Sequence, residues 1–248
     1  MRAYSINRFL NKLLFWRNTD RKLQQKAFRK MLPRLSIQER FTKIYEINYW
    51  GNSESKSGDG STLELTNNLR QELPKLFDKF SIHTVFDGPC GDFNWMRHVV
   101  TNTNIIYIGA DIVAPLIENN KKYANSHIKF LKLDLTKDKL PKADLMICRD
   151  CLFHLSYQDT LLLLNNYLES NTQYLLTTSY KNQPVFENKD ILSGHFRKID
   201  LLSSPYFFNS KPLYKIDDWL PGEHPRYLYL WSRNQVAEAV IALKSHTS

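Results

Sequence analysis

The stretch Val85-Phe86-Asp87-Gly88-Pro89-Cys90-Gly91-Asp92-Phe93 decides the fold, because an apolar run ends here in an acid and a turn that contains two glycines. The apolar residues are typical of a buried strand, and the glycines let backbone approach a ligand closely. A phosphate-binding loop would need more glycine and a lysine, and neither is present. The stretch therefore predicts a strand that ends at a binding site of another kind.

Outward from this strand the chain alternates between short apolar runs and longer amphipathic ones. We expect strands at residues 84–87, 105–111, 128–134, 143–149, 174–179, 213–216 and 227–231, and helices at residues 95–100, 113–123 and 158–168. Strands that alternate with helices favour a mostly parallel sheet covered on both faces. The predicted fold class is α/β, a doubly wound sheet of about seven strands, mostly parallel with an antiparallel C-terminal strand.

A polar segment rich in glycine and serine, residues 52–62, precedes these elements and is expected to be a loop. Ser61 is followed three residues later by Glu64, which fits a capping box, and apolar residues then recur at helical spacing. The sequence therefore predicts a helix that begins at Ser61.

The formal net charge of +9 is unevenly distributed along the chain. Residues 1–43 hold twelve Lys or Arg against two acids, a net charge of +10, which leaves the remainder at −1. A body of near-neutral charge has no overall field that would hold a polynucleotide, so nucleic acid is not expected as a partner. Any electrostatic partner is expected to bind the N-terminal arm alone.

This arm, residues 1–43, also carries an apolar stripe that Ile6, Phe9 and Leu13 begin at helical spacing. Three interpretations are open: a basic amphipathic helix on an anionic membrane surface, a mitochondrial-type transit peptide, or a helix packed on the body. We expect a basic amphipathic helical extension at residues 1–45 and one folded domain at residues 46–248.

Two further features bear on location. No apolar run reaches the roughly 18 residues that a membrane-spanning helix needs. The odd number of cysteines, three, argues against a secreted disulfide framework. The expected location is the cytoplasm, with the inner face of a membrane as an option, and the sequence leaves the oligomeric state open.

Acids stand at the ends of four successive predicted strands: Asp87, Asp111, Asp134 and Asp150. In an open sheet of this type, ligands bind beyond the carboxyl ends of the strands, where the strand order reverses. Asp111 lies 24 residues past Asp87, about where an acid binds the ribose hydroxyls in nucleotide-binding folds. A single acid at such a position also fits a helix N-cap, but the four together indicate a site.

Over roughly residues 57–231 the chain resembles the class I S-adenosylmethionine (SAM)-dependent methyltransferases. Asp87-Gly88-Pro89-Cys90-Gly91 resembles their first motif, and the segment from Asp144 to Leu155 resembles their fourth-strand motif. The strings PCGDFNWM, YIGADIV and CRDCLFHLS are similar to a subgroup of small bacterial methyltransferases. Phe93 departs from the commonest first motif, which has a third glycine there. The resemblance implies a Rossmann-like fold, SAM as the cofactor and methyl transfer as the activity.

The chemistry of SAM, a sulfonium cation joined to an amino acid and an adenosine, suggests a role for each candidate. Asp87 or Asp92 would hold the amino group, and Asp111 the ribose hydroxyls. Asp134 would lie at the adenine edge. The candidate cofactor residues are Asp87, Gly88, Gly91, Asp92, Asp111, Ile112, Asp134, Leu135 and Arg149.

Catalysis needs the acceptor in line with the methyl group, and a base where the acceptor is protonated. If a helix begins at Asp150, Asp150 and His154 share one face, with His154 as base and Asp150 as its orienting partner or as an acceptor contact. His154 also fits a buried structural histidine, and Arg149 an ion pair with a nearby acid. Cys148 and Cys151 have C-x-x-C spacing, but a zinc site would need about two more ligands, so no metal is expected.

Arg197, Tyr206 and Phe207 follow the fifth predicted strand and are the candidate acceptor residues, because they offer a guanidinium and aromatic platforms. They equally suit packing at the sheet edge. The leading hypothesis is O-methylation of a cell-surface saccharide or a lipid-linked glycan precursor, because a neutral body with a basic amphipathic arm suits a membrane-bound glycan. The alternatives are methylation of RNA or a small metabolite, and a non-catalytic binding protein that kept the cofactor fold.

Overall fold

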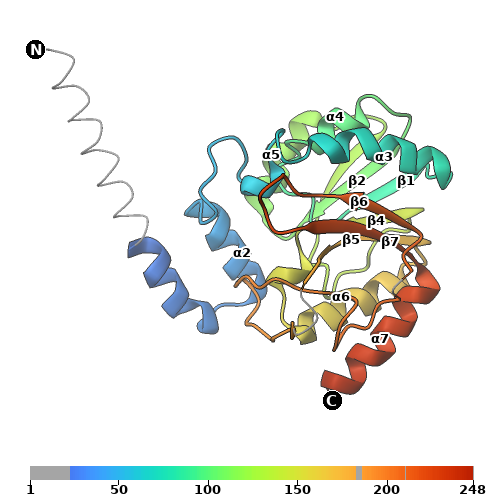
Figure 1. Cartoon of the computed structure of the whole chain (residues 1–248). Helices are drawn as coiled ribbons and strands as arrows, with labels where there is room; N and C mark the ends of the chain where they lie inside the picture. Colours follow the sequence, from blue (N-terminus) through green and yellow to red (C-terminus); the bar gives the residue numbers. More distant parts are fainter. Residues whose placement is uncertain (1–22, 183–185, 210, 248) are drawn as a thin grey trace, which may run out of the picture.

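A seven-stranded sheet in the order β3-β2-β1-β4-β5-β7-β6 forms the centre of the computed structural model, which describes residues 23–182, 186–209 and 211–247 (Figure 1). The strands are β1 (Thr84–Asp87), β2 (Ile106–Asp111), β3 (Ile128–Lys132), β4 (Leu145–Cys148), β5 (Tyr174–Tyr180), β6 (Tyr214–Asp217) and β7 (Arg226–Ser232). The pairs among β1 to β5 are parallel, and β7 is antiparallel to both β5 and β6. This confirms the predicted Rossmann-like α/β fold.

The strand order reverses at β1, which pairs with β2 on one side and with β4 on the other. Because these strands are parallel, their carboxyl ends meet at one edge of the sheet. Asp87 ends β1, Asp111 ends β2, and Arg149 follows β4 directly. The topology therefore gathers at one edge residues that are far apart in the sequence.

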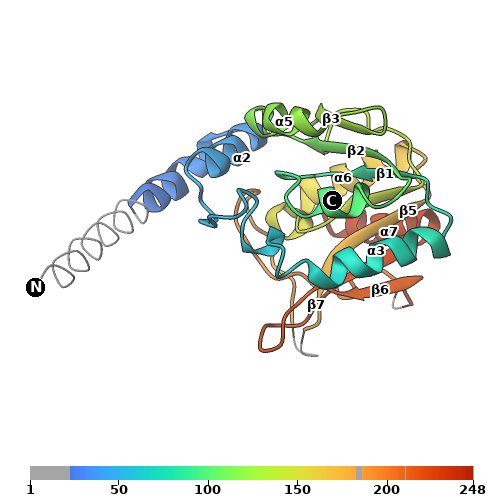
Figure 2. The same cartoon turned by 90° about the horizontal axis from the view of Figure 1, so that it is seen from above.

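Helices cover both faces of the sheet (Figures 1 and 2). One face carries α3 (Asn67–Lys79), α4 (Met96–Val100) and α5 (Ala114–Asn120), and the other carries α6 (Tyr157–Glu169) and α7 (Arg233–Thr247). The helix α7 was not predicted from the sequence, although its buried residues recur at the i, i+3, i+4 and i+7 spacing of a helix face. These residues are Val236, Ala239, Val240 and Leu243.

The helix expected to begin at Ser61 begins instead at Asn67, with Thr66 as its N-cap. Asp59–Ser61 form a short 3-10 helix, η2, and Glu54 accepts a hydrogen bond from the backbone N–H of Leu63 at 2.7 Å. The segment that contains η2 and Leu63 is therefore a loop, because polar side chains can satisfy the backbone N–H groups of a loop as readily as those of a helix end.

The helix α2 (Ile37–Glu46) belongs to the folded body. It begins with a true capping box, in which Ser36 and Glu39 bond to each other's backbone N–H. Phe41 packs against the cores on both faces of the sheet, and the Tyr45 hydroxyl accepts a hydrogen bond from Asn119 at 3.1 Å. The helix α2, which lies at the boundary expected after residue 45, therefore packs on the folded body.

Residues 23–31, which we call the basic helix, precede η1 (Leu32–Arg34) and α2. The apolar stripe that begins at Ile6 lies outside the described residues. No helix in the described part of the chain is long and apolar enough to cross a membrane.

Candidate cofactor and acceptor site

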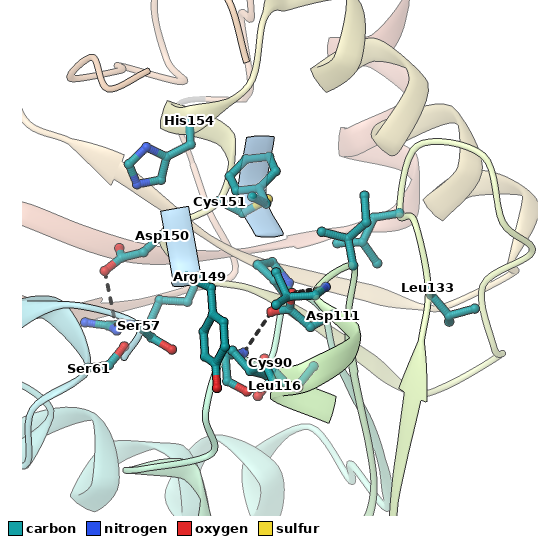
Figure 3. Close-up of a pocket in the computed structure, with 18 of the residues that line it drawn as sticks. Ser57, Ser61, Cys90, Asp111, Leu116, Leu133, Arg149, Asp150, Cys151 and His154 are labelled. Atoms are coloured by element: carbon teal, nitrogen blue, oxygen red, sulfur yellow. Dashed lines mark hydrogen bonds and ion pairs between the residues drawn. The ribbon is translucent and has the colours of Figure 1, made fainter. Parts of the chain in front are cut away.

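A cavity opens at the carboxyl edge of the parallel strands, and loops after β1, β2, β3 and β4 form one side of it (Figure 3). Most of the predicted cofactor residues line it, namely Asp87, Gly91, Asp111, Ile112, Asp134, Leu135 and Arg149. Asp150 and His154 line it as well, whereas Gly88 and Asp92 are not part of its wall. The sequence motifs therefore converge on one site.

The two glycines after β1 act differently. Gly91 has φ +56°, a conformation that favours glycine, and a Cβ there would collide with the side chain of Ser57. A Cβ on Gly88 would lie 2.9 Å from a methyl carbon of Leu135. Gly91 thus shapes the cavity wall, and Gly88 lets Leu135 pack closely behind it.

Phe93 stands where the resembled motif has a third glycine, and it adopts φ +58°. Its ring is buried, with centroids 5.0 Å from those of Tyr107 and Phe130. Aromatic packing therefore offsets the cost of a left-handed conformation that glycine would adopt freely.

Asp87 is buried at the end of β1, where its Oδ2 accepts a hydrogen bond from the Tyr107 hydroxyl at 2.7 Å. Burial raises the pKa of Asp87 to about 7, although the Tyr107 hydrogen bond and the charge of Arg149 act in the opposite direction. The amino group of a ligand in the cavity would supply the positive charge that stabilises this carboxylate.

Asp92 was the other candidate for that amino group, and its oxygens already have partners in the loop before α3. They accept hydrogen bonds from the Ser55 hydroxyl at 3.0 Å, the Lys56 backbone N–H at 2.7 Å and the Ser57 hydroxyl at 3.3 Å. Asp92 therefore fastens this loop to the first motif, and Asp87 remains as the acid that faces the cavity.

Asp111 lies at the end of β2, where its carboxylate accepts hydrogen bonds from the backbone N–H groups of Gly91 at 3.2 Å and Val113 at 3.0 Å. Burial raises the pKa of Asp111 to about 6 despite these bonds. The bonds fix the carboxylate at the cavity wall beside Ile112 and leave lone pairs for further donors, such as a pair of hydroxyls.

Asp134 follows β3 and lines the cavity together with Leu133 and Leu135. Its Oδ1 accepts hydrogen bonds from the backbone N–H and the hydroxyl of Thr136 at 3.0 and 2.6 Å. This part of the wall combines apolar side chains with one carboxylate, which suits a flat ring that has a polar edge.

Arg149 and Asp150 belong to a group of four alternating charges, the four-charge network, with Asp218 and Arg226; Arg149 and Asp218 are buried and the other two are partly exposed. Arg149 holds Asp218 through two hydrogen bonds of 3.0 and 2.9 Å, and Arg226 bridges Asp218 and Asp150 at 3.2 Å each. Burial alone would raise the pKa of Asp150, but Arg149 and Arg226 hold it below its ordinary value. The formal charges cancel, so this end of the cavity is polar and neutral.

No helix begins at Asp150, which has φ +53°, and His154 lies in the 3-10 helix η4 (Leu152–His154). The expected shared helical face of Asp150 and His154 is therefore wrong. The ring of His154 is oriented by another group, because its Nδ1 lies 2.8 Å from the backbone carbonyl oxygen of His195. A carbonyl only accepts, so Nδ1 carries the hydrogen and Nε2 keeps a lone pair.

The surroundings of His154 keep it neutral. Burial lowers its pKa, although the His195 hydrogen bond and the charge of Asp150 oppose this effect. Its ring packs beside Trp50, with centroids 5.3 Å apart, and it lies on the same side of the cavity as Asp150 (Figure 3). A neutral imidazole with a free Nε2 lone pair is suited to accept a proton at neutral pH.

Several aromatic and aliphatic residues of the wall were not predicted from the sequence, and four of them come from α2 and the segment that follows it. They are Ile37, Phe41, Tyr45 and Trp50. The first three recur every fourth residue, which indicates one face of a helix. Nothing in the sequence showed that this face turns toward the cofactor edge, because that depends on how α2 packs.

The three expected acceptor residues lie outside the cavity wall. Arg197 donates a hydrogen bond to the Tyr206 hydroxyl at 2.6 Å and lies over the ring of Tyr157. Arg197 and Tyr206 are buried, and Phe207 is exposed to solvent. Arg197 and Tyr206 fasten the segment 186–209 to α6 through Tyr157, so the cavity wall is formed without them.

The cysteines are free and buried, and Cys90 and Cys151 line the cavity. The described residues contain no group of three His, Cys, Asp or Glu suited to hold a metal ion.

No protein-family model and no curated protein sequence matches the chain. Solved structures of low sequence identity resemble it. A SAM-dependent methyltransferase from Leishmania major has a TM-score of 0.54 at 13% identity, over 68% of this chain and 77% of that one. Magnesium protoporphyrin IX methyltransferase from Synechocystis, with bound SAM, has a TM-score of 0.54 at 10% identity, over 80% and 98%.

A third similar structure is the 1,6-didemethyltoxoflavin-N1-methyltransferase of Burkholderia thailandensis, with its acceptor and S-adenosylhomocysteine (SAH) bound. It has a TM-score of 0.53 at 10% identity, over 67% of this chain and 79% of that one. The chain therefore has the fold of class I SAM-dependent methyltransferases, and neighbours of this fold are crystallised with SAM or SAH.

Proposed function

We propose that the chain binds SAM at the carboxyl edge of β1 to β3 and transfers its methyl group to a hydroxyl on an uncharged part of its acceptor. The order of the wall supports this placement of the cofactor. Asp87 would hold the amino group, Asp111 the ribose hydroxyls, and Leu133, Asp134 and Leu135 the adenine. When bound, SAM supplies an activated methyl group on a sulfonium sulfur.

His154 carries the catalytic part of the proposal. Its Nδ1 is fixed by the His195 carbonyl, its lowered pKa keeps it neutral, and its ring is part of the cavity wall. His154 would accept the hydroxyl proton at Nε2 as the acceptor oxygen attacks the methyl carbon. The C–S bond breaks with its electron pair on sulfur, so the products are the methyl ether, SAH and an imidazolium that releases its proton.

A saccharide hydroxyl is the acceptor that we propose. The four-charge network is neutral, so an acceptor beside Asp150 needs no net charge. The aromatic side chains of Tyr45 and Trp50 and the oxygens of Ser61 and Asp150 line the same cavity, and sugars bind to this combination of flat faces and hydrogen-bond acceptors. The net charge of −1 outside the arm disfavours RNA.

The test of the base replaces His154 by Ala in the full-length chain. We expect methyl transfer to fall by about 10²-fold or more while SAH affinity measured by calorimetry is retained. His195→Ala is the matched control, because it keeps the backbone carbonyl that orients the ring and should keep most of the activity. Nearly full activity of the His154→Ala variant would show that this histidine is structural.

The acceptor class is tested with methyl-tritiated SAM and three pools: sugar nucleotides and lipid-linked saccharides, short RNAs, and amine and aromatic metabolites. The proposal expects label in the saccharide pool that depends on His154. Label in either other pool would overturn the acceptor assignment. Tight SAM binding without label in any pool would favour a non-catalytic binding protein.

A further inference from the structure

The outer face of the basic helix combines cations with exposed apolar side chains. Leu23, Lys26, Ala27, Lys30 and Met31 recur at the i, i+3, i+4, i+7 and i+8 spacing of one helix face, and all five are exposed. Leu23 is 60% exposed and Met31 is 48% exposed. A helix that served only to pack on the body would not need two large apolar side chains on its solvent side.

The opposite face of the basic helix is fixed to the body. Phe28 is buried, Gln25 donates a hydrogen bond to the backbone carbonyl of Tyr49 at 2.8 Å, and Arg29 donates one to the Tyr49 hydroxyl at 3.0 Å. Leu32, which follows directly, is also buried. These contacts hold the helix in one orientation. Because this face is attached to the body, the outer face points away from it.

The charge around this face has one sign. The sequence contains no Asp or Glu between Asp20 and Glu39, and within the part of the chain that the structure describes no ion pair involves Lys26 or Lys30. The helix projects beside α2 (Figures 1 and 2), and α2 contributes Ile37, Phe41 and Tyr45 to the cavity wall.

We propose that this face docks on an anionic membrane surface. Lys26 and Lys30 would lie at the lipid headgroups, and Leu23 and Met31 would insert between the headgroups. Lysines at an anionic surface and apolar side chains at the headgroup boundary are the two contributions that interfacial helices combine. Phosphates of a nucleic acid would attract the lysines equally but offer nothing to the exposed Leu23 and Met31. The docking does not depend on the proposed methyl transfer.

The test is sedimentation of the full-length chain with vesicles of phosphatidylcholine that contain about 30% phosphatidylglycerol, against vesicles of phosphatidylcholine alone. We expect binding to the anionic vesicles that weakens in about 0.5 M salt. Lys26→Glu with Lys30→Glu should lower the partition coefficient about 20-fold or more. Leu23→Asn with Met31→Asn should lower it as well and leave the residual binding more sensitive to salt.

The matched control reverses two exposed lysines on the body, Lys129→Glu with Lys139→Glu, which changes the net charge equally and should leave vesicle binding nearly unchanged. Circular dichroism checks that each variant is folded, and SAH binding should be the same in all of them. An equal loss in the control, or no binding of the full chain to anionic vesicles, would overturn the proposal. Insensitivity to the Leu23 and Met31 substitutions, together with tight RNA binding, would assign the face to nucleic acid.

Discussion

The two halves of the cavity, a proposed cofactor half around Asp87 and Asp111 and a proposed acceptor half around Asp150, hold their carboxylates by different kinds of partner. In the cofactor half, Asp87 and Asp111 receive hydrogen bonds from a tyrosine hydroxyl and from backbone N–H groups, and burial raises their pKa values to about 7 and about 6. In the acceptor half, Arg226 pairs with both Asp150 and Asp218. Arg149 and Arg226 together lower the pKa of Asp150, whereas burial raises the pKa of Asp218 despite the same two arginines.

This difference shows which half is completed by the chain itself and which by a ligand. The acceptor half holds as many cations as acids in its four-charge network, so its charges are already matched. The cofactor half has carboxylates whose ionised forms become more favourable when a cation enters the cavity. For that reason a positively charged cofactor such as SAM fits the cofactor half.

The largest effect that tests this comparison comes from breaking the four-charge network. Asp218→Ala leaves Arg149 and Arg226 with a single carboxylate between them in a buried place, and we expect a loss of about 3–5 kcal/mol in the free energy of unfolding. Urea denaturation measures it. Glu118→Gln, which removes an exposed ion pair with Lys121, should change the same quantity by less than about 1 kcal/mol. A small effect of Asp218→Ala would contradict the view of this half as a self-sufficient network.

The second-largest effect is on the pH dependence of stability, which should differ between a variant in the cofactor half and a variant in the acceptor half. The ordinary pKa of Asp87 is 3.8, and its raised native value of about 7 means that the unfolded chain loses this proton first. Asp87 therefore makes the wild type less stable relative to Asp87→Asn as the pH rises toward 7, by about 2–3 kcal/mol between pH 5 and pH 8.

Asp150→Asn is the counterpart in the other half. Because the native pKa of Asp150 is lowered, its contribution is fully present above the unfolded value and is lost only as the pH falls below that value. The cost of Asp150→Asn should therefore be constant between pH 5 and pH 8. Denaturation curves at both pH values measure the two differences, and parallel behaviour of the two variants would contradict the comparison.

The smallest effect concerns ligand binding through Asp111. Asp111→Ala removes the carboxylate that we propose binds the ribose hydroxyls, and we expect SAH affinity to fall by one to two orders of magnitude, about 1.4–2.7 kcal/mol. Isothermal calorimetry measures it, with the exposed acid Asp78 replaced by Ala as control. Unchanged affinity would remove Asp111 from the cofactor site.

Local sequence patterns predicted which acids meet at the carboxyl edge of the sheet, because each of them stands at or close after the end of a strand. Asp87, Asp111 and Asp134 stand at or just after the ends of β1, β2 and β3, and a parallel sheet necessarily brings those ends together. The acceptor half was predicted less well. Arg149 is paired with Asp218, which lies 69 residues further along the chain, and Asp150 is paired with Arg226, which lies 76 residues further. Both partners lie between β6 and the start of β7.

The predictions that the structure did not follow have the same cause: the partner of a side chain is not apparent from the local sequence. Arg197 and Tyr206 have the residue types of a ligand site, but they bind each other in the interior. Ser61 and Glu64 have the spacing of a capping box, but loop contacts compete with the helix end there. Residue type and spacing describe what a side chain is able to bind, and the nearest partner in the folded chain decides what it does bind.

The sequence by itself determined the α/β alternation, the placement of Asp87, Asp111 and Asp134 at one edge of the sheet, and the segregation of positive charge into the first 43 residues. These follow from periodicity and composition, which are local properties. Only the tertiary structure decided that α2 closes the cavity, that the His195 carbonyl orients His154, and that the Arg226 guanidinium holds Asp150 ionised. Those contacts join residues distant in sequence, and their formation depends on packing that brings complementary groups within hydrogen-bond distance.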